Sequence, residues 1–148
     1  MYVKQYKIVK TVASVTNYLA GAMYTIFVVL FVLSFFKNFA TLISSSDLIG
    51  AIENFVNSCV LSNISFLLAG IGLSLIARIL GDEASSLRAR LINEIYGELA
   101  LYGRVRLDHL KSYGFKDLTE IMNFIKEVEK DMKVSISVNP DAGEAYIS

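Results

Sequence analysis

The feature that most constrains this chain is a run without any charged side chain over residues 12–36. A helix needs about 20 apolar residues to cross the hydrocarbon core of a bilayer, which is about 30 Å thick. This run is roughly 37 Å long as a helix at about 1.5 Å per residue, so it can cross with some tilt. The alternative is the core helix of a soluble protein, but the rest of a chain of 148 residues is too small to cover it on all sides. We therefore expect a transmembrane helix.

A second apolar run over residues 59–80 has no charge before Arg78 and predicts a second span. Between the spans, the residues Ser-Ser-Ser-Asp47 are typical of a turn with an N-cap, and they lead into an amphipathic connection over residues 47–58. Basic residues flank both inner ends of this hairpin, and the outer loop contains only Lys37. By the positive-inside rule we expect a multi-pass protein of the cell membrane with both termini in the cytoplasm.

The first ten residues predict an amphipathic helical lead-in at the headgroup layer. Lys4, Lys7 and Lys10 recur at helical spacing, with Tyr2 and Tyr6 beside them. A cleavable signal peptide is the competing interpretation, but the apolar run is too long and lacks an Ala-x-Ala site at its end. We expect a retained anchor.

Small and polar residues lie on one stripe of each span and predict close helix packing, because such residues let two helix backbones approach in a membrane. The residues that we expect to pack are Asn17, Gly21, Ser62, Gly70 and Ser74. Whether the hairpin packs on itself, on a second copy of the chain or on other subunits stays open.

After residue 81 the composition becomes that of a globular domain. Residues 1–81 contain five basic and two acidic side chains, whereas residues 82–148 contain nine basic and twelve acidic ones. Helical periodicity ends near Gly103, a capping box at Asp117 and Glu120 opens another helix, and residues 134–138 alternate as a strand. A turn cluster at residues 139–143 predicts a hairpin.

The order helix, short strand, helix, turn, helix, hairpin resembles the winged helix-turn-helix family. The matching parts are residues 103–107 (Gly-Arg-Val-Arg-Leu), a third helix over residues 117–132 and a wing at residues 139–143. We therefore expect a mainly α membrane protein: a two-helix transmembrane hairpin over residues 1–81, followed by a small α+β winged-helix-like cytoplasmic domain over residues 82–148. The resemblance implies either DNA reading or a protein-interaction role, as in PCI-type and ESCRT-type assemblies.

The charges of this domain favour a protein partner over DNA. The third helix has five acids against Lys126 and Lys130, and the hairpin over residues 134–148 has no basic residue. DNA binding depends on basic residues that neutralise phosphates, so nucleic acid is disfavoured as a partner. The polar helix face that we expect to bind a protein partner comprises Thr119, Asn123, Lys126 and Lys130.

Catalysis has little support in the sequence. His109 is the only histidine and Cys59 the only cysteine, so neither a metal cluster nor a nucleophilic triad is available, and we expect no cofactor. We therefore expect a non-enzymatic accessory or scaffolding subunit of a membrane assembly that binds a protein. The alternatives are a membrane-tethered DNA-binding transcriptional regulator and a structural membrane protein of a virion or similar particle.

Overall fold

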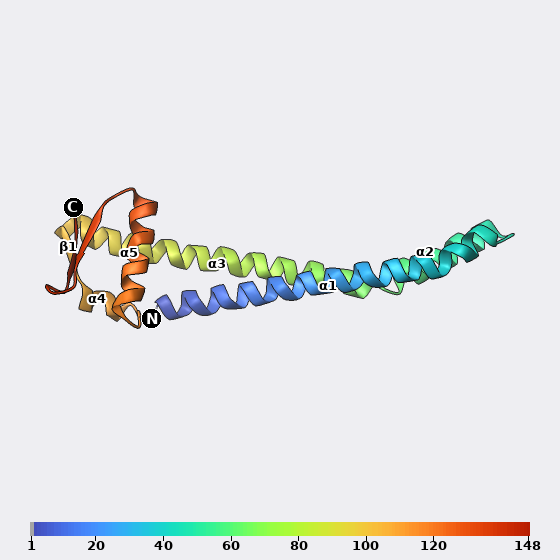
Figure 1. Ribbon diagram of the computed structural model, residues 1–148, viewed down its shortest axis with the longest axis horizontal. Coiled ribbons are helices and arrows are strands. Elements are labelled where there is room, and N and C mark those ends of the chain that lie inside the picture. Colours follow the sequence, from blue (N-terminus) through green and yellow to red (C-terminus); the bar gives the residue numbers. More distant parts are fainter. Residues whose placement is uncertain (1) are drawn as a thin grey trace. The chain divides into compact units, whose positions relative to one another are not determined.

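The computed structural model describes residues 2–148, which are mainly helical with one small sheet (Figure 1). Two compact units make up the chain: residues 12–80, here called the apolar hairpin, and residues 2–11 with 81–148, here called the compact domain. The elements are α1 (Tyr2–Ser44), α2 (Leu48–Val56), the π-helical turn η1 (Asn57–Leu61), α3 (Ile64–Tyr102), β1 (Arg104–Arg106), α4 (Leu107–Ser112), α5 (Leu118–Met132), β2 (Ile136–Asn139) and β3 (Glu144–Ile147).

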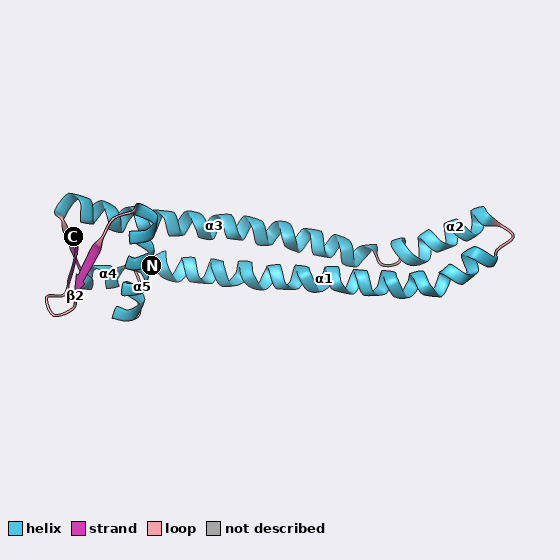
Figure 2. Ribbon diagram, turned by 45° about the horizontal axis from the view of Figure 1, so that its top comes forward, coloured by secondary structure: helices cyan, strands magenta, loops and turns pink. Residues whose placement is uncertain are grey.

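The apolar hairpin consists of α1 lying antiparallel to α2 and the first part of α3 (Figure 2). Helix α1 continues beyond the predicted end at residue 36 to Ser44, because no glycine or proline interrupts residues 37–44. The connection is therefore the short loop of residues 45–47. The predicted N-cap is confirmed: the Asp47 carboxylate accepts a hydrogen bond from the Gly50 N–H at 3.2 Å.

The returning segment is interrupted by η1 where the sequence predicted the second span to begin. In this turn the Ser62 N–H donates to the Asn57 carbonyl at 3.0 Å, one residue further back than in an α-helix. The Asn63 amide donates to the carbonyl of the buried Cys59 at 3.2 Å, so a polar side chain is satisfied inside the hairpin. From Ile64 the helix runs on without a break into the compact domain.

Both long helical segments are apolar and largely uncovered. Among residues 2–148 there are two helical segments long and apolar enough to cross a membrane, residues 2–44 and 48–102. Only 6% and 17% of their most apolar windows are buried within the chain. A core helix of a soluble protein would be mostly buried, so the chain itself does not provide the covering that these helices need.

The compact domain contains the start of α1, the end of α3, α4, α5 and a sheet of order β1-β3-β2. Both pairs are antiparallel, and Ala145 at the centre of β3 faces Val105 on one side and Val138 on the other. Gly103 (φ 68°) ends α3 and Gly143 (φ 66°) ends the turn before β3, two left-handed positions that favour glycine. The helices and strands predicted after residue 81 are thus confirmed.

The first residues of α1 belong to the compact domain together with residues 81–148, whereas the sequence pattern assigned them to the membrane hairpin. Val3 is only 2% exposed and joins the core formed by Leu91, Ile95 and Phe124. Its backbone N–H donates to the Tyr113 carbonyl at 3.3 Å, which satisfies one of the free donors of the first helical turn. The sequence pattern did not predict this packing, because the core partners of Val3 are far away in the sequence.

Candidate functional site

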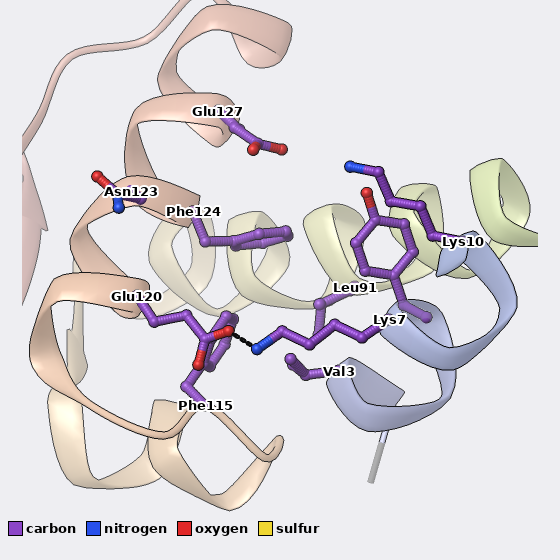
Figure 3. A pocket seen from close by; sticks show the side chains of 10 residues that line it. Val3, Lys7, Lys10, Leu91, Phe115, Glu120, Asn123, Phe124 and Glu127 are labelled. Carbon is purple, nitrogen blue, oxygen red and sulfur yellow. Dashed lines mark ion pairs between the residues drawn. The ribbon is translucent and has the colours of Figure 1, made fainter. Parts of the chain in front are cut away.

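A pocket of about 160 Å³ lies where the start of α1 meets α5 (Figure 3). Its apolar wall combines residues from four parts of the domain: Val3, Leu91, Phe115 and Phe124. The Phe115 and Phe124 rings pack with their centroids 5.3 Å apart and their planes tilted by 52°. Because both rings belong to the domain core, the wall of the pocket is held rigidly.

Charged side chains from α1 and α5 form the rim of the pocket. Tyr6, Lys7 and Lys10 come from α1, and Glu120, Asn123 and Glu127 come from α5 (Figure 3). Lys7 forms an ion pair with Glu120, whose second oxygen accepts a hydrogen bond from the Lys116 N–H at 2.7 Å. The Lys10 ammonium lies 5.5 Å from the centroid of the Tyr6 ring, a cation–π contact.

The acids of α5 are used largely within the domain. Arg88 of α3 donates to Glu127 at 3.0 Å and to Asp131 at 2.7 Å, and the Glu129 carboxylate accepts from the Ile136 N–H at 2.7 Å. Burial lowers the pKa of Arg88, but hydrogen bonds and the charges of Asp131 and Glu127 outweigh it, so this pKa lies above its ordinary value. The acidic character of the third helix in the sequence therefore overstates the negative charge that it presents outward.

The four predicted partner-binding residues are all exposed on α5. Asn123 lines the pocket, whereas Thr119, Lys126 and Lys130 do not. Within residues 2–148, neither Lys126 nor Lys130 has a carboxylate partner. Their role in partner binding stays a prediction.

A second polar cluster joins α3 to the segment after α4. The Glu98 carboxylate accepts a hydrogen bond from the Tyr113 hydroxyl at 2.9 Å and lies 2.9 Å from His109 Nε2. Burial and this hydrogen bond to Glu98 raise the pKa of Tyr113 to about 12, because both disfavour the phenolate. The only histidine thus has a structural partner on the domain surface.

In the apolar hairpin, two of the five predicted helix-packing residues meet at one side chain, Tyr24. A Cβ added at Gly70 would lie 2.9 Å from the Tyr24 ring, and the Tyr24 hydroxyl lies 3.2 Å from the Ser74 hydroxyl oxygen. Gly70 therefore provides the space in which this ring packs. Asn17, Gly21 and Ser62 are exposed, and a Cβ at Gly21 would meet nothing within 4 Å.

No group of three or more potential metal ligands occurs within the described residues 2–148, and Cys59 is a buried free thiol. No protein family model, curated protein or solved structure matches the sequence. The pocket and the exposed face of α5 are therefore interpreted from their own chemistry. The site residues predicted from the sequence include Asn123 but not Val3, Lys7 or Tyr24, because the contacts of these three residues are with partners far away in the sequence.

Proposed function

We propose that this chain is a membrane-anchored accessory or scaffolding subunit whose winged-helix-like domain binds a protein partner. One observation carries the proposal: the chain joins an apolar hairpin that it leaves largely uncovered to a compact domain with a pocket lined by aromatic and charged residues. The hairpin offers a bilayer the apolar surface that the chain leaves uncovered. The domain offers a partner a rigid aromatic wall surrounded by charged groups, a combination typical of protein-binding surfaces.

The winged-helix assignment has support in the connectivity of the domain. The end of α3 is followed by β1, α4, α5 and the β2–β3 hairpin, and β3 lies between the other two strands. This is the order that the resemblance implies, with α5 as the third helix and residues 139–143 as the wing. The wing carries no basic residue, which disfavours a role over DNA phosphates.

The proposed membrane topology is supported by the packing of Val3. This residue precedes the apolar hairpin of residues 12–80, and its core partners follow that hairpin. If both segments cross the membrane, the two ends of the chain must lie on the same side. The distribution of basic residues assigns that side to the cytoplasm.

Purification of the full chain from its native membrane in lipid nanodiscs tests the function. We expect a protein that remains bound in a fixed ratio to the wild type and is lost from the Lys126→Glu variant. The Arg90→Glu variant is the control, because Arg90 is an exposed residue on α3 without an ion pair among residues 2–148. A wild-type protein that carries no protein in a fixed ratio would contradict the proposal.

One observation favours the tethered DNA-binding regulator as a second candidate. Arg88 and Lys7 form ion pairs with three acids of α5. These acids therefore do not neutralise the lysines on the exposed face of the helix. A fluorescence anisotropy titration of the full chain in nanodiscs with random duplex DNA separates the two candidates. We expect no binding tighter than about 10⁻⁴ M at physiological salt, whereas micromolar binding that weakens steeply with salt would favour the regulator.

A further inference from the structure

The pocket between α1 and α5 has the size of a single large side chain. Its volume of about 160 Å³ is close to that of an engineered apolar cavity of about 150 Å³ that binds benzene. A phenylalanine or leucine side chain therefore fits it, whereas a lipid acyl chain is several times larger. The rigid wall of Phe115, Phe124 and Leu91 provides the setting in which an inserted apolar side chain contributes most of its binding energy.

The charges around this pocket are matched within the domain except at one position. Glu120 pairs with Lys7, and Glu127 pairs with Arg88. Lys10 contacts the Tyr6 ring but has no carboxylate partner among residues 2–148. A bound group can therefore complement the rim by placing a carboxylate beside Lys10.

Asn123 completes the rim with a polar group suited to a peptide backbone. Its exposed amide makes no hydrogen bond within residues 2–148, and it offers both donors and an acceptor next to the apolar wall. A carboxylate, an apolar side chain and a backbone amide together are the groups of a short acidic peptide segment.

We propose that this pocket receives one aromatic or large aliphatic side chain of a protein partner, with an adjacent Asp or Glu of the same segment placed beside Lys10. The inference rests on the proposed function and specifies the chemistry that the partner presents. Val3 and Lys10 both belong to the start of α1, so the recognition site exists only where that helix packs on the domain.

The first test uses the full chain in nanodiscs with labelled methyl groups at Val3 and Leu91, titrated with N-acetyl-Phe-Asp-amide and N-acetyl-Phe-Asn-amide. We expect saturable shifts of both methyl signals, with the Asp peptide binding about two- to fivefold more tightly, the range of an exposed ion pair. Lys10→Gln should abolish this preference, whereas Lys4→Gln should retain it, because Lys4 is exposed and does not line the pocket.

The second test fills the pocket from its rim. Asn123→Trp should abolish the methyl shifts, whereas Met122→Trp should leave them, because Met122 is the exposed neighbour on α5 that does not line the pocket. Absence of saturable shifts in the folded wild type, or equal binding of the two peptides, would overturn the inference. So would free 3-phenylpropionate binding more tightly than the Asp peptide, since a small-molecule site would then be the better description.

The failure of this inference can be told apart from a failure of the proposed function. If the wild type retains a protein in a fixed ratio and Asn123→Trp retains it equally, the pocket is not the contact, but the binding function stands. If the wild type retains none, the binding function fails. The peptide titrations then report whether the pocket alone recognises the acidic aromatic segment.

Discussion

Lys7 of α1 and Glu120 of α5 form an ion pair that ties the beginning of the chain to a helix near its end. Three residues before Glu120, the Asp117 carboxylate caps α5 by accepting from the Glu120 N–H at 2.8 Å. The start of α1 is thus attached where α5 begins, beside the buried Val3. The compact domain therefore depends on residues that precede the apolar hairpin.

The first prediction concerns this dependence. Val3→Ala should lower the stability of the compact domain by about 1–2 kcal/mol, because it removes apolar volume from a buried position of the core. Ile8→Ala is the control, since Ile8 is 53% exposed. Thermal unfolding of the full chain in nanodiscs measures both. Equal stabilities of the two variants would show that α1 is not part of the domain core.

The second prediction concerns the contact between Gly70 and Tyr24. Gly70→Ala should destabilise the packing of the hairpin by about 1–3 kcal/mol, because the new methyl group overlaps the ring. Gly72→Ala should be neutral, since nothing lies within 4 Å of its added Cβ. Tyr24→Leu should partly rescue Gly70→Ala. Circular dichroism measures helix unfolding in detergent and so compares the stabilities of all three variants.

The third prediction concerns Arg88. Arg88→Gln should reduce stability by about 1 kcal/mol, because it removes two partly exposed ion pairs and leaves Glu127 and Asp131 to repel each other. Arg90→Gln should change it by less than about 0.5 kcal/mol, as expected for an exposed residue without such contacts. The difference between the variants should shrink in high salt. A salt-independent difference would mean that packing, rather than charge, is responsible.

The fourth prediction concerns alkaline pH. The pKa of Tyr113 is raised from 10.0 to about 12, so the folded state keeps its proton where the unfolded state loses it. The stability from this tyrosine is therefore complete below pH 10 and is lost as the pH rises through about 12. Unfolding curves of the wild type and Tyr113→Phe should show a steeper loss for the wild type in this window. Parallel curves would contradict the prediction.

The fifth prediction concerns the orientation of the hairpin in the membrane. With Cys59 replaced by serine, Ser45→Cys should react with an impermeant thiol reagent in intact cells, and Ser148→Cys should react only after lysis. This result follows from the positive-inside rule. Labelling of Ser148→Cys alone in intact cells would invert the orientation. Labelling of both, or of neither until lysis, would contradict a hairpin that crosses twice.

Local features of the fold could be predicted from the sequence. The cap at Asp47, the cap at Asp117 and the turn at residues 139–143 each depend on residues close in the chain, and all three are present. The two apolar segments were found for the same reason, since an uninterrupted run is visible without knowledge of its neighbours.

Contacts between distant parts of the chain could not be predicted in the same way. The Arg88 ion pairs leave few unpaired acids on α5, but no spacing in the sequence links Arg88 to Glu127. Of the predicted stripe of small residues, Gly70 and Ser74 lie against Tyr24, whereas a Cβ added at Gly21 would meet nothing within 4 Å. The sequence pattern did not identify Tyr24, the large residue whose ring requires a glycine at position 70.

The burial of Val3 also has a consequence for biosynthesis. Translation produces Val3 before the apolar hairpin, whereas Phe124 and Val128 of the same core are made after it. The beginning of the chain must therefore stay accessible while the apolar hairpin is made and turns back. A ribosome-stalled chain that ends before α5 should leave residue 3 open to protease, and completion of the chain should protect it.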